Sequence, residues 1–261
     1  MPLELAPELL AGITVVVLVA GAVNGLAGFG FALVGTMALA TAIDPATAVV
    51  FMIAPILAVN ISLVRDLSPA ELRSCSQRFA PLMVAALAGT LVGLVILDRL
   101  PQGPLKVGLG IISLAFVASA QEAVTVPGLE RTKEGCFVET TPGMVGVGGV
   151  SGLLFGGTNV GVQLIAYLRS CDLSHGVFVG VVALVFLGLN GVRIGAAGVL
   201  GMYPSVTVAL ASALAAIPAA AGVAVGKRLR SSVGQRLRRS AVLGLLTVIG
   251  VRLVLGGLGI V

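Results

Sequence analysis

Charged residues are scarce in this chain of 261 amino acids. Asp, Glu, Lys and Arg together make up 10% of it, hydrophobic residues make up 57%, and the mean hydropathy is +1.12. A soluble domain carries about 25% charged residues, so this composition cannot supply a water-facing surface. The long stretches without Asp, Glu, Lys or Arg are 9–43, 45–64, 79–97, 140–168, 173–192 and 194–226. Since about 20 residues cross a bilayer, we expect an all-α polytopic membrane protein.

Residues for catalysis and metal binding are also few. The chain has no tryptophan, one histidine and three cysteines, Cys75, Cys136 and Cys171, without CxxC spacing. We therefore expect no disulfide framework, no metal site and no cofactor. No Asp or Glu lies in the middle of a span, so the chain offers few acid–base groups for an intramembrane enzyme or a carboxylate proton relay. His175, beside Asp172, is interpreted as a loop residue.

Basic residues gather in the loop 227–239, KRLRSSVGQRLRR, which carries six of the sixteen Lys and Arg residues. Short basic loops stay on the cytoplasmic side of a membrane. No aromatic residue is interleaved there to stack on bases. We therefore interpret the loop as a topology signal, and we expect no nucleic-acid partner.

The sequence repeats itself at about half its length. NGLAGFGF, starting at Asn24, is echoed by SGLLFGGT, starting at Ser151, and ISLVRD with Arg65 is echoed by LNGVRI with Arg193. The offset between matched positions is 127 to 128 residues. We divide the chain into a first transmembrane repeat, 1–120, a cytoplasmic linker, 121–139, and a second transmembrane repeat, 140–261.

Each repeat begins with a long segment interrupted by glycine, 9–43 or 140–168, and three simpler spans follow. The simpler spans are 46–65, 79–97 and 104–120, then 173–193, 204–226 and 239–260. The positive-inside rule compares two arrangements. If all eight segments cross and the basic loop is inside, nine Lys and Arg residues lie inside and six outside. If the two long segments turn back as hairpins, twelve lie inside and three outside.

The hairpin arrangement therefore fits the basic residues better, with single broken spans as the alternative. It places the loops 65–78, 121–139 and 227–239 in the cytoplasm. It also inverts the two repeats relative to each other, which is typical of secondary transporters with broken helices around the substrate. We expect two inverted repeats, each a Gly-broken helical hairpin plus three transmembrane helices.

The glycine pairs Gly28/Gly30 and Gly156/Gly157 are expected at the two hairpin tips. There the chain needs a positive φ or a close backbone approach, which glycine permits. The helix after such a turn begins with free N–H groups, so two converging helix N-termini would hold an anion without a formal positive charge. Close packing of helices through small residues is the alternative explanation.

Polar residues near these turns extend the candidate site, although hydrogen bonds between helices would also explain them. The candidate substrate-binding residues are Asn24, Gly25, Gly28, Phe29, Gly30, Asn60, Ser151, Gly152, Gly156, Gly157, Thr158, Asn159, Gln163 and Asn190. The repeat-related Arg65 and Arg193 are candidate anion gates at the inner and outer mouths, with snorkelling to the interface as the alternative. Arg252, in the last span, has no obvious partner and is a second-rank candidate.

The duplicated motif resembles the TauE/SafE family of sulfite and sulfonate exporters, also called the toluene sulfonate uptake permease family. The motif reads NGLAGFGFALVGTMALATAIDPATAV and later SGLLFGGTNVGVQLIAYLRSCDLSHGV. The resemblance covers nearly the whole chain and implies transport of small sulfur-containing anions. The turn residues that it carries over are Gly25, Gly28 and Gly30, and Gly152, Gly156 and Gly157.

The chain departs from the family pattern, in which three successive glycines often precede a proline. Phe29 and Phe31 interrupt the first turn, Thr158 closes the second, and no proline follows either. This departure bears on the identity of the anion more than on the fold.

We expect an inner-membrane secondary transporter that exports sulfite or organosulfonates by alternating access, and no enzyme. The alternatives are a channel or uptake permease for another small anion, and a membrane scaffold without transport. The expected partners are a small anionic substrate and the lipid bilayer, and a homo-oligomer is left open. Export needs no coupling ion, because moving one negative charge outward gains about 2.3 kcal/mol per 100 mV.

Overall fold

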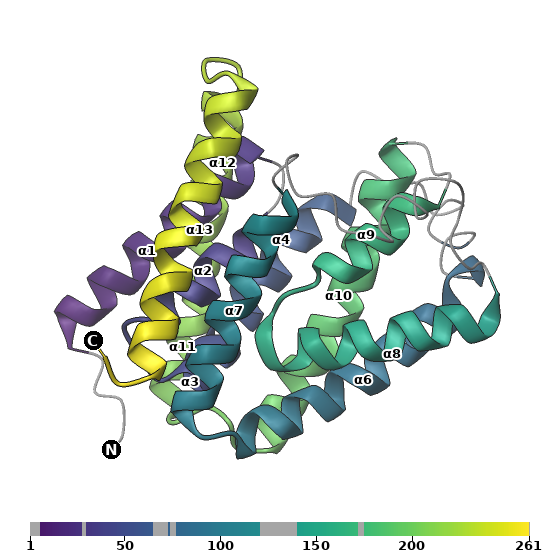
Figure 1. Cartoon of the computed structure of the whole chain (residues 1–261), viewed down its shortest axis with the longest axis horizontal. Coiled ribbons are helices and arrows are strands. Elements are labelled where there is room, and N and C mark those ends of the chain that lie inside the picture. Colours follow the sequence, from purple (N-terminus) through teal and green to yellow (C-terminus); the bar gives the residue numbers. More distant parts are fainter. Residues whose placement is uncertain are drawn as a thin grey trace. The chain divides into compact units, whose positions relative to one another are not determined.

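The computed structural model of the chain describes residues 6–27, 30–64, 73, 77–120, 140–171 and 175–260. Within these ranges every regular element is a helix. The helices are α1 (Pro7–Ala27), α2 (Phe31–Ala40), α3 (Pro45–Phe51), α4 (Ile53–Val64), α6 (Ala80–Arg99), α7 (Gln102–Ala120), α8 (Thr141–Thr158), α9 (Val162–Ser170), α10 (His175–Val199), α11 (Val206–Leu214), α12 (Ala216–Leu229) and α13 (Gln235–Gly257) (Figure 1). Five apolar stretches in the described residues are long enough to cross a membrane. The all-α polytopic membrane class is confirmed.

Polar caps mark where several helices begin. Asp44 precedes α3, and its Oδ2 accepts hydrogen bonds from the backbone N–H of Thr47 at 2.8 Å and from the Thr47 hydroxyl at 2.9 Å. Thr140 caps α8 through Gly143 N–H, and Ser205 caps α11 in the same way. Each cap satisfies an N–H group that the first helical turn leaves free.

Both long Gly-interrupted segments are broken helices. The segment 9–43 holds α1 and the ten-residue α2, and the segment 140–168 holds α8 and the nine-residue α9. At 1.5 Å per residue, α2 and α9 each reach only about half the thickness of a bilayer. α2 folds back along α1, since a Cβ placed on Gly35 would lie 3.4 Å from the Cβ of Ala20.

The helices group into two compact units, and both predicted repeats contribute to each unit. Unit 1 contains Met1–Val59, Asp98–Glu122 and Ala197–Val261, and unit 2 contains Asn60–Leu97 and Ala123–Ala196. The boundary between the two units falls within α4, because unit 2 begins at Asn60. The division into two sequence repeats stays a prediction, because the helices that pack together in each unit come from both repeats.

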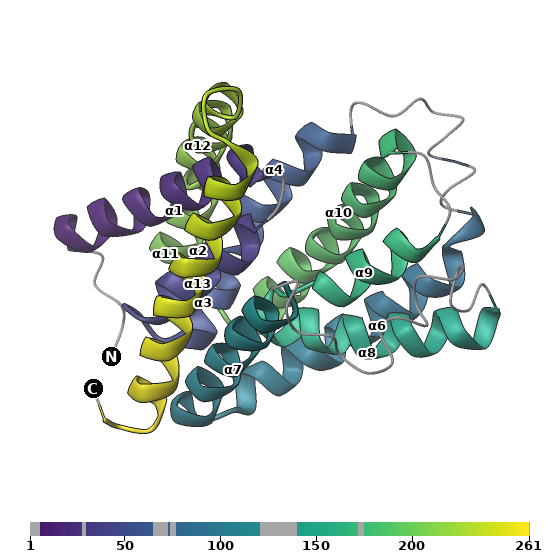
Figure 2. The same ribbon diagram turned by 45° about the horizontal axis from the view of Figure 1, so that its top comes forward.

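Unit 1 is built on two helix pairs with close backbone contact. α1 packs in parallel on α12, where a Cβ on Gly25 would lie 2.3 Å from the carbonyl oxygen of Val223 (Figure 2). α7 packs antiparallel on α13, where a Cβ on Gly110 would lie 2.7 Å from the carbonyl oxygen of Gly250 (Figure 1). The Ser113 hydroxyl donates to the carbonyl of Leu246 at 3.0 Å across this second pair. Small residues thus bring these backbones together.

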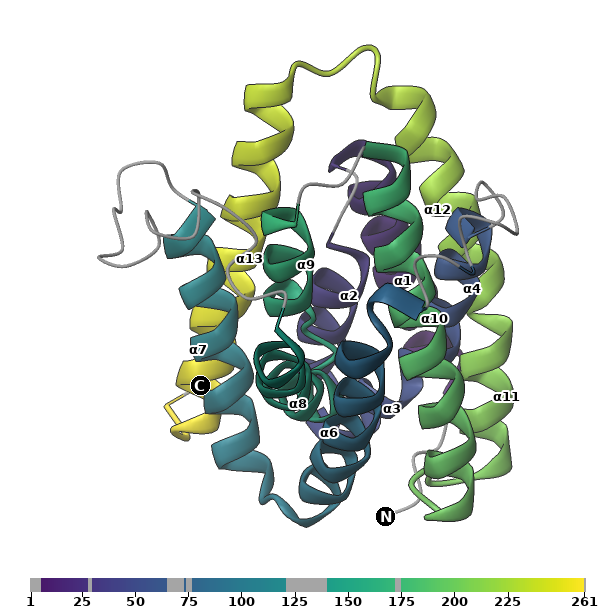
Figure 3. The same cartoon turned by 90° about the vertical axis from the view of Figure 1, so that its right-hand side faces the viewer.

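Unit 2 contains an equivalent parallel pair, α6 and α8, which lie side by side in Figures 1 and 3. Three glycines of α8 face three carbonyls of α6, four residues apart on both helices. An added Cβ would lie 2.5 Å from the Leu82 oxygen for Gly148, 2.1 Å from the Ala86 oxygen for Gly152 and 2.2 Å from the Thr90 oxygen for Gly156. The Thr90 hydroxyl donates to the Gly152 carbonyl at 3.2 Å. At these three positions the pair leaves no room for a side chain larger than hydrogen.

Candidate functional site

The break in the second repeat lies between α8 and α9. Asn159, the residue after α8, has φ +61°, and Gly161 is the N-cap of α9. The predicted tip at Gly156 and Gly157 is wrong by two to three residues, because both glycines are helical and lie within α8. The reason is that Gly156 is needed for close packing on α6, while Asn, which visits the left-handed region more readily than most residues, makes the turn.

The break in the first repeat includes Gly30, which has φ +100° and is the N-cap of α2. The predicted positive φ at Gly30 is therefore confirmed, and only glycine adopts it without strain. Gly28 and Phe29 lie outside the described residues. Gly25 is helical and packs on α12, so it contributes contact rather than a turn.

Arg193 joins α10 to the second break. One of its terminal nitrogens, Nη1, donates to Asn159 Oδ1 and to Asn190 Oδ1 at 3.4 Å, and Nη2 donates to the Gly156 carbonyl oxygen at 2.9 Å. The guanidinium carbon lies 5.0 Å above the centre of the Phe155 ring. Three predicted candidates, Asn159, Asn190 and Gly156, therefore meet at the guanidinium of a fourth, Arg193.

The whole cluster is buried. Arg193 and Asn190 are 0% exposed and Asn159 is 1% exposed. The acceptors named above are two amides and a carbonyl, all neutral, and Phe155 adds a cation–π contact. A cation in such an interior is costly unless donors are satisfied and negative potential is near. The orphan carbonyls at the end of a helix provide part of that potential, and Gly156 lies in the last turn of α8.

The burial of Arg193 excludes one of the two interpretations given for the repeat-related arginines. Snorkelling is wrong for Arg193, because the side chain points into unit 2 and reaches no surface. Its role as an anion gate stays a prediction. Arg65 lies outside the described residues.

The other predicted residues divide between packing and local hydrogen bonds. Ser151 is buried in α8, and Asn60 is buried in α4. The Thr158 hydroxyl donates to the Leu154 carbonyl at 2.6 Å and accepts from the Val160 N–H at 3.1 Å, which holds the break. Asn24 is half-buried in α1.

The start of α9 offers donors at the same break. Its N-cap, Gly161, has no side chain, and the first backbone N–H to enter the helical hydrogen-bond pattern is that of Ile165, which donates to the Gly161 carbonyl. The earlier N–H groups of the first turn have no intrahelical acceptor. Gln163 lies in this turn, and its buried Oε1 has no hydrogen-bond partner among the described residues. The break therefore combines a helix N-terminus with a buried guanidinium.

Phe155 was missed from the sequence, as was Phe186, whose ring centre lies 5.1 Å from that of Phe155. A signal existed in α10, since Phe186, Asn190 and Arg193 stand at positions i, i+4 and i+7 and so share one helix face. The Asn190 amide donates back to the Phe186 carbonyl at 2.8 Å, which fixes its oxygen toward Arg193.

The fold and the site together define a multi-pass helical membrane protein with two broken helices and a buried cation at one break. The family described as Sulfite exporter TauE/SafE matches residues 13–253. The chain belongs to this family of membrane transporters, which confirms the resemblance seen in the duplicated motif. Among curated proteins and among solved structures, the chain has no significant match.

Proposed function

We propose that this protein is a secondary transporter that exports small sulfur-containing anions, such as sulfite or organosulfonates, by alternating access, with the anion held at the Gly-rich helix break beside Arg193. Family membership supports the substrate class. The observation that carries the proposal is the buried Arg193 beside the α8–α9 break. An anion in a low-dielectric interior needs a fixed positive group, and a guanidinium can bind two oxygens of one oxyanion, such as pyramidal sulfite or a tetrahedral sulfonate, with two parallel hydrogen bonds.

An exchange of hydrogen-bond acceptors at Arg193 would couple binding of the anion to movement of α9. Arg193 donates to the neutral amide of Asn159, and hydrogen bonds to an ionised acceptor are roughly twice as strong as neutral ones. An arriving oxyanion would therefore replace Asn159 at the guanidinium. Asn159 is the turn residue of the break, so the loss of its hydrogen bond to Arg193 would free α9 to change its position. α9 would then have two positions, one without and one with the anion, as alternating access requires.

The inverted arrangement of the repeats belongs to the same proposal. α7 and α13 are the predicted equivalents in the two repeats, and they pack antiparallel through Gly103 with Gly257 and Gly110 with Gly250. An axis in the membrane plane generates such an antiparallel pair, which supports inversion. The expected loop 227–239 is shorter in the structure, since α12 runs to Leu229 and α13 begins at Gln235, which leaves 230–234 between the helices. The six basic residues of 227–239 support a cytoplasmic position for this turn and for the loops 65–78 and 121–139 in a bacterial-type inner membrane.

Export is the favoured direction on energetic grounds. A negative interior drives a monoanion outward by about 2.3 kcal/mol per 100 mV, and a dianion by about twice that. No coupling-ion site is needed for this direction.

The test is flux of sulfite and sulfoacetate in proteoliposomes under an imposed potential. We expect saturable flux in the wild type and a loss of at least about tenfold in Arg193→Gln, since the charged hydrogen bonds to the anion are removed. Arg228→Gln removes an exposed arginine in the last turn of α12 and should leave flux unchanged. Equal flux in wild type and Arg193→Gln would refute the role of Arg193. Flux that does not saturate would indicate a channel, and a folded protein without flux of any sulfur anion would indicate a scaffold.

A further inference from the structure

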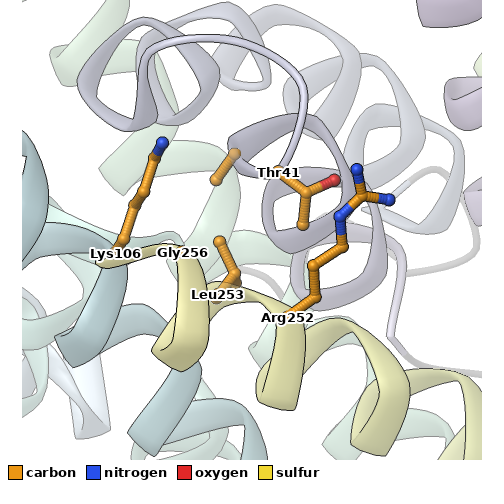
Figure 4. Close-up of a pocket in the computed structure, with 6 residues that line it drawn as sticks. Thr41, Lys106, Arg252, Leu253 and Gly256 are labelled. Carbon is orange, nitrogen blue, oxygen red and sulfur yellow. The ribbon is translucent and has the colours of Figure 1, made fainter. Parts of the chain in front are cut away.

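A second basic feature lies in unit 1, on helices other than those that carry Arg193. A cavity of about 110 Å³ is bounded by three elements: the end of α2, the start of α7 and the last part of α13. Its lining residues are Ala40, Thr41, Lys106, Arg252, Leu253 and Gly256. Figure 4 shows Lys106 and Arg252 projecting from two neighbouring helices, with Thr41 between them (Figure 4).

Close helix packing holds the two cations on one side of the α7–α13 pair. Lys106 lies between Gly103 and Gly110, two α7 glycines that pack against the backbone of α13. Because the helices are antiparallel, this stretch of α7 faces the last turns of α13, where Arg252 is placed. The backbones meet at glycine, so they have little freedom to move apart and separate the two charges.

The electrostatics of this cavity favour an anion. Lys106 is half-buried and Arg252 is exposed, and no acidic residue stands among the described residues that line the cavity. Two cations that face one small space repel each other, and an anion between them turns this repulsion into attraction. Charged residues are few in this chain, which makes the convergence of two from separate helices informative.

The shape and the hydrogen-bonding groups limit the ligand. The space corresponds to several water molecules, at about 10–15 Å³ for each, so a small tetrahedral oxyanion fits and a bulky ligand does not. The Thr41 hydroxyl already donates to the Ala38 carbonyl at 2.7 Å, so it offers only an acceptor. Lys106 and Arg252 are therefore the donors to the ligand, and Thr41 can accept only from a ligand that carries an O–H, such as inorganic phosphate.

We propose that this cavity binds a tetrahedral oxyanion of sulfur or phosphorus, supplied either as a free ion or as the phosphate of an anionic lipid headgroup. Arg252 at the exposed rim meets the anion first, and Lys106 binds it at the half-buried end. The site does not depend on the proposed transport function, because it shares no residue with the Arg193 cluster.

The free-ion arm titrates sulfate and inorganic phosphate into the full-length protein in a neutral detergent, with heat of binding as the readout. The variants are Lys106→Gln, Arg252→Gln and the double variant. Arg99→Gln removes the charge of an exposed arginine that does not line the cavity and is the matched control. We expect the dissociation constant to rise about tenfold or more in the double variant and to stay within about twofold in the control.

The lipid arm places the same proteins in nanodiscs of phosphatidylcholine with or without phosphatidylglycerol, and native mass spectrometry counts the lipids retained after release. Retention of phosphatidylglycerol by the wild type and Arg99→Gln, but not by the double variant, assigns the site to a lipid phosphate. Sulfate or phosphate binding with the same dependence on the two cations assigns it to a free ion. The proposal is overturned if the wild type binds neither, or if the double variant, with helix content unchanged by circular dichroism, binds as the wild type does.

Discussion

Two glycines of α8, three residues apart, should differ in how much folding free energy the same substitution costs. A Cβ on Gly152 would lie 2.1 Å from the Ala86 carbonyl oxygen of α6, whereas a Cβ on Gly149 would meet no described atom within 4 Å. We therefore compare Gly152→Ala with Gly149→Ala. Both add one methyl group to the same helix, so they share the gain in helix propensity and differ only in what the methyl group meets.

The size of the effect follows from these distances. Ordinary contact begins at 3.4 Å, so Gly152→Ala forces α6 and α8 apart locally by about 1.3 Å, the difference from 2.1 Å. The neighbour is backbone, which cannot rotate away as a side chain does. Overpacking of this kind costs about 1–3 kcal/mol, whereas the propensity gain of alanine over glycine is at most about 1 kcal/mol. We expect Gly152→Ala to lose about 1–2 kcal/mol of folding free energy and Gly149→Ala to be neutral or stabilised.

Thermal melting in detergent measures the difference. Tryptophan fluorescence is not an option because the chain has no tryptophan, so the readout is helical circular dichroism together with the fraction that stays monodisperse on gel filtration. At about 2–4 °C per kcal/mol, Gly152→Ala should melt several degrees below Gly149→Ala. Equal melting temperatures for the two variants would show that the α6–α8 contact is not as close as described.

Three further predictions concern topology, capping and the break. For topology, single cysteines are introduced at the exposed positions Leu100, Val199 and Ser232, in a background with alanine at Cys75, Cys136 and Cys171. The hairpin arrangement predicts that Leu100→Cys is labelled from the same membrane side as Val199→Cys and from the opposite side to Ser232→Cys. Eight plain crossings predict instead that Leu100→Cys is labelled from the same side as Ser232→Cys. Asp44→Ala should cost about 1 kcal/mol in thermal melting through loss of the α3 cap, and Asp44→Asn should retain most of it. Asn159→Gly keeps the left-handed turn but removes an acceptor of the buried Arg193, so we expect an altered KM for sulfite and a melting temperature below that of the wild type. Asn159→Ala loses the same acceptor and also strains the turn, so a melting temperature of Asn159→Gly as low as that of Asn159→Ala would contradict this.

Sequence reasoning predicted the spans closely because bilayer thickness sets their length. The span expected at 79–97 is α6, Ala80–Arg99, and the span expected at 104–120 is α7, Gln102–Ala120. It also identified both broken segments, since a glycine-rich run inside a long apolar stretch is costly in an unbroken helix. These conclusions need only local composition and length.

The position of the second break and the burial of Arg193 needed tertiary information. Glycine serves both turns and close packing, so the pair Gly156 and Gly157 could not be assigned to either without knowing that α6 lies against it. Arg193 stands close to a span end in sequence, which favours snorkelling, until Asn159 and Gly156 are seen to supply acceptors in the interior. No periodicity indicates which glycine face meets which helix, so the pairing of α1 with α12 was also not predicted.

The pairing of α1 with α12 has a consequence for biogenesis. α1 ends at Ala27 and its partner begins at Ala216, so roughly 190 residues are synthesised between them. At about 5–20 residues per second, the glycine face of α1 remains uncovered in the membrane for about 10–40 s. During that interval α1 needs a temporary neighbour, such as lipid or the insertion machinery. A ribosome that stalls before α12 therefore leaves α1 inserted without the helix that covers its glycine face, and quality-control proteases would meet the nascent chain in that state.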